Sequence, residues 1–577
     1  MWRDWRLFVP KSITVLRQGY GLPDFRADAI AGLTVAIVAL PLAMALAIAS
    51  GTTPDVGLVT AVVAGFLISA LGGSRFQIGG PTGAFVVIVY GVITNHGYDG
   101  LLMATLMAGG ILIVAGLLRV GTLIKYIPDP VTTGFTSGIA VIILASQIKD
   151  FLGLSADKVP AEFIPKLQAL WAARDSLSLP GFGLAAACLA AILLLRRHAP
   201  RLPGFLLVTI AAAVAVMVLK LPVDTIGSRF GGVAAQLPVP NLHFWHWDKV
   251  RDVLPSAFTI ALLAGVESLL SAVVADQMTG ARHRSNIELV AQGIANVASA
   301  AFGGLPATGA IARTATNVRT GARSPVAGMA HAAFLLLFML VLAPVMKFVP
   351  LAALAAILVM VALNMAEIHR FRLILGTTHG DRAVLLATFA LTVLVDLTVA
   401  IEIGMVMASF LFMHRMAGLA TIEGGEPVIE EDRDDLERRE TRYAPNFGLP
   451  SDVAVITFRG PLFFGSASVL KDAFDQIGAR RRAYILRLEE TPMVDPTGAF
   501  ALADFLKRAL DDGAEVVVCG ASRTVMRALL RGIAAPTLKS VRFVGTFEEA
   551  RTRVTAAGDG AETKTAGSPV GGSRPPI

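Results

Sequence analysis

Two short segments, GGPTGA at Gly79–Ala84 and GGLPATGA at Gly303–Ala310, interrupt the apolar sequence of this chain. In each of them a pair of glycines is followed by a proline and then by Thr-Gly-Ala. The first segment opens the third apolar run of the chain and the second opens the tenth. With an odd number of runs in each half, the second copy would enter a membrane the opposite way up. Matching Gly/Pro interruptions of this kind predict an inverted repeat with a binding site between its halves.

The physical chemistry of an interrupted helix explains why such a site would bind an anion. A helix that begins inside the membrane leaves its first N–H groups unpaired, and its dipole places partial positive charge there. Two such ends that face each other would attract an anion without fixed cations. The alternative is that the glycines only permit close helix packing. The candidate substrate residues of the two segments are Gly80, Pro81, Thr82, Gly83, Ala84, Thr308, Gly309, Ala310, Ile311, Ala312 and Arg313.

The composition is that of a membrane protein. Of 577 residues, 54% are hydrophobic and only 16% are charged, whereas an average soluble domain has about 25% charged residues. The apolar residues form runs long enough, as helices, to cross a hydrocarbon layer of about 30 Å. We count 14 such runs between residues 29 and 413, several of them split by proline or glycine. The sequence therefore predicts a polytopic α-helical membrane protein with 14 spans.

The distribution of charge predicts the orientation of these spans. The net charge is +7, but the basic residues gather in alternate short connections, as the positive-inside rule requires. We therefore expect a bacterial inner-membrane protein with both termini in the cytoplasm, and no nucleic-acid partner. Met1–Tyr20 has no cleavable signal pattern, and Cys188 and Cys519 provide no disulfide or metal framework. No nucleotide-binding loop is present either, so we expect no enzyme activity, metal or cofactor.

The composition also predicts the division into domains. We expect a cytoplasmic segment at 1–26, a transport domain at 27–418, an acidic linker at 419–444, a small α/β domain at 445–557 and a disordered tail at 558–577. In the α/β domain, strands are expected at 453–458, 483–488 and 515–519. Helices are expected at 467–477, 498–511, 523–532 and 547–554.

Glu267 is a carboxylate near the middle of an apolar span. Such a charge costs about 2.5–3.5 kcal/mol on insertion scales, so it should face a cavity and have a partner. Ser271, one turn further on, lies on the same helix face. Burial favours the neutral acid, which predicts that Glu267 carries a proton. The alternative is a structural carboxyl group bonded to a broken helix.

Further charges lie in or near the membrane. Arg313 follows the second Thr-Gly-Ala motif and should sit in the first turn of that half-helix, where it adds a full positive charge. It could instead be a snorkelling arginine at the cytoplasmic face. Asp276, Arg282, Arg284 and Glu288 are nearer the cytoplasmic boundary. We expect them to be ion-paired residues of gate or loop regions, with substrate ligands as the alternative.

Motifs along the chain match those of a known family. They are Ala31–Ala36, Leu40–Ala43, Gly79–Thr82, Phe135–Gly138, Gln147–Asp150, Glu267–Ser271, Asn286–Gly293, Gly303–Gly304 and Arg313. In these segments the sequence resembles the sulfate permease (SulP) family, the bacterial relatives of solute carrier family 26, along essentially its whole length. The resemblance implies a uracil-permease-like fold of 7+7 inverted repeats, with a core domain that moves against a gate domain in an elevator-like cycle. It also implies a homodimer, a C-terminal cytoplasmic STAS domain with possible cytoplasmic partners, and a contribution of Leu40 and Ala43 to the substrate site.

The resemblance also bears on the coupling ion. Sodium-coupled bicarbonate members have an aspartate where Glu267 stands and a threonine where this chain has Ile311. That departure favours the proton-coupled branch, and the overall likeness is to the bacterial C4-dicarboxylic acid transporter of the family.

In the STAS-like domain, Thr497 matches a phosphoacceptor position, with a simple helix N-cap as the alternative.

The sequence thus favours a secondary active transporter that takes up a sulfate-type oxyanion or a C4-dicarboxylate together with protons. The alternatives are a sodium-coupled bicarbonate transporter, a passive anion channel, and a membrane sensor that signals through the STAS domain.

Overall fold

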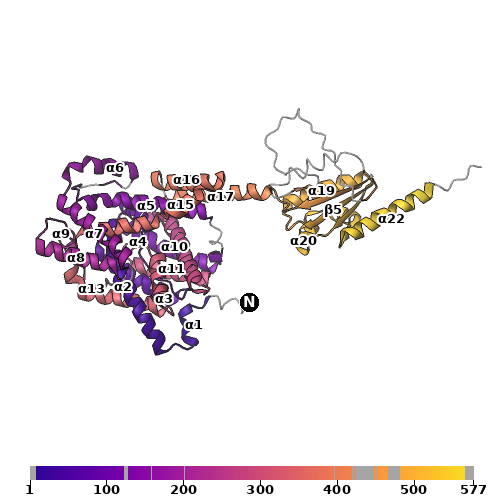
Figure 1. Ribbon diagram of the computed structural model, residues 1–577. Coiled ribbons are helices and arrows are strands. Elements are labelled where there is room, and N and C mark those ends of the chain that lie inside the picture. Colours follow the sequence, from indigo (N-terminus) through magenta and orange to yellow (C-terminus); the bar gives the residue numbers. More distant parts are fainter. Residues whose placement is uncertain are drawn as a thin grey trace, which may run out of the picture. The chain divides into compact units, whose positions relative to one another are not determined.

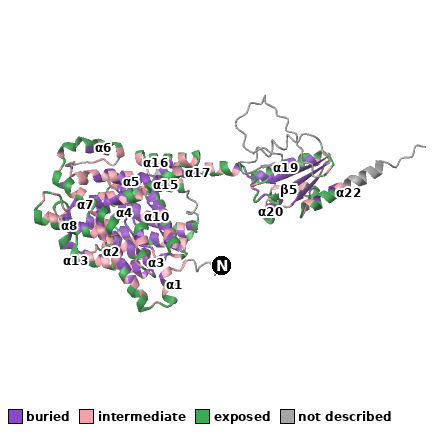
Figure 2. Cartoon of the chain, in the orientation of Figure 1, coloured by how far each residue is buried: buried purple, intermediate pink, exposed green. Residues whose placement is uncertain are grey.

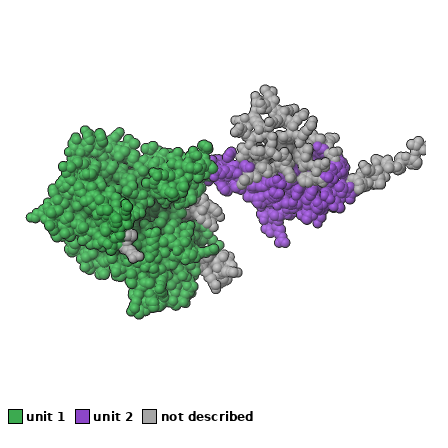
Figure 3. All heavy atoms as spheres, viewed as in Figure 1, with its two compact units in different colours: residues 1–408 green, residues 409–577 purple. Residues whose placement is uncertain are grey.

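The computed structural model describes residues 8–122, 128–156, 159–160, 162–199, 202–395, 397–418, 421–422, 448–450, 452–464 and 481–565. The chain divides into two compact units, residues 1–408 and residues 409–577 (Figure 3). The boundary between the units falls inside the last apolar helix, ten residues before the domain boundary at 418 expected from composition.

The first unit is a bundle of α-helices (Figure 1). Nine helices among the described residues are long and apolar enough to cross a membrane. The number 14 for all spans stays a prediction. The helices are α1 (Lys11–Arg17), α2 (Leu22–Ala49), α3 (Pro54–Leu71), α4 (Phe85–Leu117), α5 (Asp129–Leu152), α6 (Phe163–Ala172), α7 (Leu179–His198), α8 (Gly204–Leu219), α9 (Ile226–Phe230), α10 (Val250–Thr279), α11 (Ser285–Ala301), α12 (Ile311–Arg319), α13 (Val326–Met346), α14 (Leu351–Met365), α15 (Ile368–Leu375), α16 (His379–Leu394) and α17 (Leu397–Ala417).

Two sets of helices pack within this unit. The first, which we call the core group, consists of α2, α3, α4, α10, α11, α12 and α13, in which α4 packs on α10 and α11 while α13 packs on α2 and α3. The second, the gate group, consists of α5, α7, α14 and α16. The buried residues in Figure 2 concentrate on the inner helices, among them α2, α3, α4 and α10.

Small residues allow the helices of the core group to approach closely. A Cβ atom placed on Gly109 of α4 would lie 2.6 Å from the carbonyl oxygen of Gly293 on α11. A Cβ atom on Gly293 would lie 2.5 Å from the carbonyl oxygen of Gly109. The backbones of α4 and α11 therefore touch at a point where neither helix can carry a side chain, as in other membrane bundles.

The second unit has a five-stranded sheet in the order β3-β4-β5-β6-β7, which is parallel except for the β3–β4 pair. Alternate residues of its strands belong to two hydrophobic clusters, for example Val455 and Ile485 in one and Ile456 and Leu486 in the other. The sheet is therefore covered on both faces, as parallel sheets require. Its elements are β3 (Thr421–Ile422), β4 (Val453–Arg459), β5 (Ala483–Glu490), α19 (Pro496–Asp511), β6 (Glu515–Cys519), α20 (Arg523–Gly532), α21 (Ala535–Ser540), β7 (Arg542–Val544) and α22 (Phe547–Thr565).

The expected strands and helices of this unit are confirmed wherever the structure describes them, with three differences. Residues 421–422 were expected in the linker but form edge strand β3 of the sheet. Helix α21 and the short strand β7 were not expected. Helix α22 continues to Thr565, past the tail boundary expected at 558. The helix expected at 467–477 and most of the expected linker lie outside the described residues.

Candidate functional site

The two interrupted segments meet in the core group. Residues Gly79–Gly80 form strand β1, which pairs antiparallel with β2 at Thr308–Gly309, so that Gly79 lies opposite Gly309. Helix α4 begins at Phe85 and helix α12 begins at Ile311, directly after their segments. The two helix starts predicted from the sequence are therefore held together by a single short pair of strands.

Steric contacts explain why glycine occupies positions 80 and 309 of this strand pair. A Cβ atom on Gly309 would lie 2.0 Å from Nε2 of Gln77. Gly80 has φ +145°, which residues with a Cβ rarely adopt, and a Cβ atom there would lie 2.7 Å from Nη1 of Arg313. Only glycine allows the two strands and these side chains to occupy the same space.

The starts of both half-helices are free of side-chain caps. The N-cap residues are Ala84 for α4 and Ala310 for α12, and neither offers a side-chain acceptor to the first N–H groups. In ordinary helices these groups are satisfied by Ser, Thr, Asp or Asn at the N-cap. Ile311 and Ala312, the first two residues of α12, are exposed, so this helix start is accessible. In α4 the N–H groups of Phe85 and Val86 donate to the carbonyl oxygens of Thr82 and Gly83, at 3.3 and 3.2 Å. It is therefore at the start of α12 that an anion can reach N–H donors that no capping side chain occupies.

Glu267 of α10 lies against the first interrupted segment. The hydroxyl group of Thr82 donates a hydrogen bond of 2.9 Å to Oε2 of Glu267. Both residues are half-buried, so the carboxyl group lines accessible space and does not sit in the packed interior. This contact agrees with the bond to a broken helix that we considered as the structural alternative, and it leaves one carboxyl oxygen for another role.

Ser271 and Glu267 form hydrogen bonds with different segments of the site. Its buried hydroxyl group donates a 3.0 Å hydrogen bond to Oγ1 of Thr314 on α12. Thr314 also accepts a bond of 3.1 Å from the N–H group of Ile78. Ser271 therefore joins α10 to α12, and the hydroxyl group beside Glu267 is that of Thr82. Sequence spacing along one helix could not predict this partner from a different segment.

Arg313 bridges the two halves of the site. It is the third residue of α12, only 4% exposed, and its Nη2 donates to the carbonyl oxygen of Pro81 in the opposite segment. Its Nη1 is buried and has no hydrogen-bond partner among the described residues. The guanidinium interacts electrostatically with Glu267 without forming an ion pair within the described part of the chain. Arg313 is therefore a buried cation of the first turn and not a snorkelling residue.

The remaining predicted residues lie around this centre. Gly83 faces the gate group, because a Cβ atom there would lie 2.8 Å from Sδ of Met365 and 3.2 Å from Cδ1 of Ile143. Leu40 and Ala43 are buried on α2, and the carbonyl group of Ala43 packs against Gly57 of α3. The structure thus places Ala43 in a contact between α2 and α3.

A buried chain of polar side chains runs beside the site and was not predicted. Gln77 donates to Ser268 over 2.9 Å, and Ser268 donates to Oε1 of Glu288 over 3.3 Å. Oε2 of Glu288 accepts hydrogen bonds from the N–H groups of Gly73 and Ser74, at 2.7 and 3.1 Å. The expectation of ion pairing is therefore wrong for Glu288, which is completely buried and has no ion pair in the described ranges.

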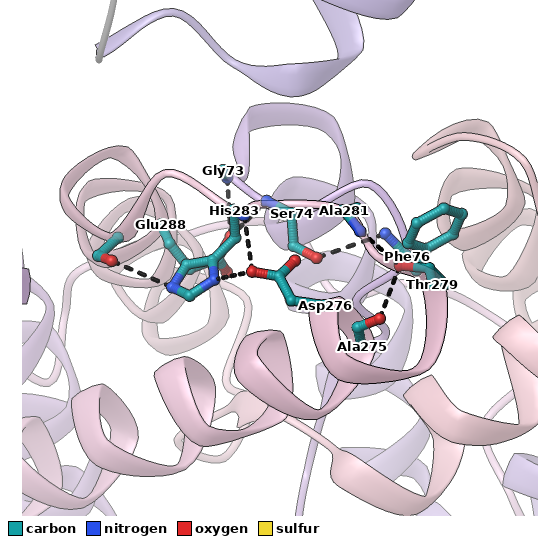
Figure 4. A network of polar contacts seen from close by, with 10 residues as sticks. Gly73, Ser74, Phe76, Ala275, Asp276, Thr279, Ala281, His283 and Glu288 are labelled. Carbon is teal, nitrogen blue, oxygen red and sulfur yellow. Dashed lines mark hydrogen bonds and ion pairs between the residues drawn. The ribbon is translucent and has the colours of Figure 1, made fainter. Parts of the chain in front are cut away.

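Asp276 contacts His283 and not one of the arginines that we named, since its Oδ2 lies 2.7 Å from Nδ1 of His283 (Figure 4). Arg284 instead donates to the carbonyl oxygen of Val9 and to Oγ1 of Thr14. The same oxygen accepts the N–H group of His283 at 2.9 Å. The neighbouring Glu288 carboxyl group belongs to the same region of Figure 4 but bonds to the turn at residues 73–74. This region joins α10 and α11 to the end of α3.

In the second unit, the candidate phosphoacceptor Thr497 lies at the start of α19 and is exposed. The N-cap of α19 is Asp495, whose Oδ1 accepts the N–H group of Gly498 at 2.8 Å. The capping role considered for Thr497 is therefore wrong, and its modification stays a prediction. The described residues contain no group of three His, Cys, Asp or Glu side chains that could hold a metal ion.

Membrane-length helices that enclose two opposed half-helices define a membrane transporter of the inverted-repeat type. Family comparison agrees with this class. The model of the "Sulfate permease family" matches residues 25–388, and that of the "STAS domain" matches residues 445–550. The chain belongs to the sulfate permease family. It is therefore an anion transporter and not an enzyme, as the sequence predicted.

Two bacterial relatives illustrate the family. "Putative sulfate transporter YvdB" of Bacillus subtilis is 41% identical over 507 residues, which cover 87% of this chain and 93% of that protein. The bicarbonate transporter BicA of Synechocystis is 31% identical over 517 residues, which cover 88% of this chain and 90% of that protein.

Solved structures support the fold. The transmembrane domain of a cyanobacterial BicA matches with 30% identity and a TM-score of 0.60, and the match covers 66% of this chain and 98% of that domain. Murine Slc26a9, an anion transporter described in the inward-facing state, matches with 15% identity and a TM-score of 0.82 over 95% of this chain and 94% of that one. At this low identity the second match concerns the fold alone.

Proposed function

We propose that this chain imports a small oxyanion or C4-dicarboxylate together with protons across a bacterial inner membrane, by an elevator-like movement of the core group against the gate group. The observation that carries the proposal is the pair of half-helix starts joined by β1 and β2, of which that of α12 is accessible and has no capping side chain, with the buried Arg313 between them. Helix starts and a guanidinium group both attract anions. They recognise negative charge more than shape, so sulfate, bicarbonate and dicarboxylates all stay candidates.

Glu267 supports coupling to protons. A pore for anions has no need of a carboxylate, which repels them, but a carrier that gains a proton with each anion does. The carboxyl group lies beside the anion site and is half-buried, and among the described residues its one hydrogen bond is that from Thr82. These features favour a proton carrier over a passive channel.

Sodium coupling with bicarbonate is the second candidate, and one observation favours it. The Thr82 hydroxyl oxygen and the Glu267 carboxylate oxygen lie 2.9 Å apart, so the structure offers two oxygen ligands side by side. Two considerations speak against a sodium site. Ile311 presents only hydrocarbon at its position, and the hydroxyl group of Ser271 is already bonded to Thr314.

Uptake into proteoliposomes decides between these functions. Sulfate, bicarbonate, succinate and fumarate should each be offered with an inward pH gradient, and separately with sodium replaced by potassium or choline. We expect accumulation of at least one anion to follow the pH gradient and to be indifferent to sodium. Strict dependence on sodium would overturn proton coupling and favour bicarbonate. Downhill flux that neither gradient can drive uphill would indicate a channel.

Three further properties belong to the same proposal. Both termini lie in the cytoplasm, the protein is a homodimer, and the STAS domain binds cytoplasmic partners or reports transport to them. Chemical crosslinking in intact membranes tests the dimer, and protease access to an epitope tag after residue 565 tests the orientation.

A further inference from the structure

A basic cavity lies in the transport unit where α6 and α9 are found. It has a volume of about 230 Å³ and is lined by residues from the end of α2, from α4, α5, α6 and α9. Helices α6 and α9 lie in the long connections at 150–179 and 220–252. The positive-inside rule, applied to the basic short connections, predicts that these two long connections are periplasmic. In that topology the cavity belongs to the outer side of the transport unit.

Its lining carries more positive than negative charge. The basic residues are Lys149, Lys166 and Arg229, and the acidic residue is Asp150. Asp150 forms an ion pair with Arg229, in which its Oδ1 lies 2.8 Å from Nη1 of the arginine. The ammonium group of Lys149 donates to the carbonyl oxygen of Ala156.

Lys166 differs from these residues in having no such partner. It is only 6% exposed, and among the described residues it forms no hydrogen bond or ion pair. Its Nζ lies 5.5 Å from the centre of the Tyr90 ring, and this is a weak form of compensation for a buried cation. Glu162 acts on it only from a distance, and burial lowers the pKa of Lys166. An ammonium group that lines a cavity and has no partner among the described residues is stabilised by an anion that enters the cavity.

The cavity leads toward the central site. Val86 and Val87 line it, and both belong to the first turn of α4, whose start forms half of that site. Ile142 of α5 also lines it, and the next residue, Ile143, packs against Gly83 of the interrupted segment. An anion in this cavity would thus stand between the core and gate groups, one helical turn from the half-helix start.

We propose that this cavity is an outer anion site, in which Lys166 holds a small free oxyanion before it passes to the half-helices. The inference rests on anion transport through the central site but not on the identity of the coupling ion. A lipid phosphate has the same chemistry as a free anion. The free anion is favoured because the lining comes from five helices, among them α2 and α4 of the core group and α5 of the gate group, and the cavity lies between helices and not on the surface of one.

Sided transport kinetics provide the first test. In right-side-out vesicles, Lys166→Gln should raise the KM for external sulfate about tenfold through loss of a charged hydrogen-bond donor, while the KM for efflux from the inside stays unchanged. Lys166→Arg should restore most of the affinity. Lys249→Gln removes an exposed charge at the start of α10 and should behave like wild type. Equal effects on both faces, or no effect of Lys166→Gln, would contradict the outer site.

Chemical labelling supplies a test that does not depend on transport. Pyridoxal phosphate added outside condenses with an unprotonated amine with loss of water, and borohydride then reduces the imine so that mass spectrometry can locate it. In bilayers of phosphatidylcholine alone, we expect labelling of Lys166 that millimolar sulfate or bicarbonate prevents. Labelling that neither anion reduces, or that only added phosphatidylglycerol reduces, would overturn a site for free anions. Protection of Lys166 in a protein that transports none of the four anions would instead contradict the proposed function alone.

Discussion

At the scale of single residues, Glu267 gives the sharpest prediction. Glu267→Gln keeps the size of the side chain and an oxygen that can still accept the Thr82 hydroxyl group, but it can no longer gain or lose a proton. We expect anion binding close to that of wild type and complete loss of pH-driven accumulation, measured as uphill uptake in proteoliposomes.

The matched control is Glu402→Gln, which neutralises an exposed carboxylate on α17. This variant should accumulate anions normally. Uphill uptake by Glu267→Gln at the wild-type level would rule out Glu267 as the proton carrier.

Arg313 allows a second prediction at this scale. Arg313→Ala should weaken anion binding about tenfold or more, since a hydrogen bond to a charged group contributes about 1.5–3 kcal/mol. Arg313→Lys should lose less of the anion affinity, because it keeps the positive charge. It should still bind more weakly than wild type, because lysine lacks the guanidinium fork. In that fork one nitrogen bonds to the Pro81 carbonyl group while the other has no partner among the described residues. Isothermal titration of detergent-solubilised protein measures both, with Arg319→Ala at the exposed end of α12 as the control. Unchanged binding in the Ala variant would restrict Arg313 to a structural role.

Whether the contacts of a residue can be predicted from the sequence depends on whether its partner lies nearby in the chain or in a distant segment. Arg313 could be assigned to the first turn of its half-helix because that position follows from one local motif. The partners of Glu267 and Ser271 come from segments distant in the sequence, and so does the turn at residues 73–74 that bonds to Glu288, so helical periodicity carried no information about these contacts. Only the bond from Gln292 to Glu288, at i and i+4 of α11, follows from that periodicity. His331 was missed for a related reason: it is fully buried and neither ring nitrogen has a partner among the described residues. Nothing around it in the sequence distinguishes it from an ordinary helix residue.

At the scale of elements, the short β1–β2 pair can be tested through its glycines. Gly309→Ala would place a Cβ atom 2.0 Å from the Gln77 side chain, so either the strand pair or the buried polar chain must shift. We expect anion binding to fall at least tenfold and the melting temperature to drop, consistent with a cost of about 1–3 kcal/mol for overpacking.

Gly110→Ala in α4 is the matched control, because a Cβ atom there meets nothing within 4 Å. Alanine is also the better helix former, so this variant should be as stable as wild type or more so. Normal binding by Gly309→Ala would mean that the pair does not hold the site together.

The elements themselves were predictable to different degrees. Long helices such as α3 and α10 follow from their apolar runs. Helix α4 spans two of the expected runs, and its helical geometry breaks at Gly97, with φ +73° and ψ −179°, so that two helices meet there at a kink. This break agrees with the two separate runs expected in this part of the chain. Strand β7, with three residues, is too short to produce an alternating pattern. Strand β3 is fixed by pairing with β4 and not by its own sequence.

At the scale of the whole molecule, the two units have separate hydrophobic cores. The main cluster of the transport unit contains residues between Ala36 and Ile401, and the clusters of the second unit contain residues between Val453 and Val554. Deletion of the chain after Arg415 should therefore leave anion binding intact, while assembly, abundance or turnover changes. Binding measured on the purified truncated protein checks this. A folded truncated protein that binds no anion would contradict the separation of the units.

Pairing between Gly79 and Gly309 also has a consequence for biosynthesis. The two glycines lie 230 residues apart in the sequence. At roughly 5–20 residues per second, the ribosome needs on the order of 10–50 s to deliver the second strand after the first. During this interval the start of α4 already lies in the membrane without the backbone partner that strand β2 later provides. The insertion machinery, or a chaperone beside it, must shelter that polar backbone from lipid until the second half of the chain arrives.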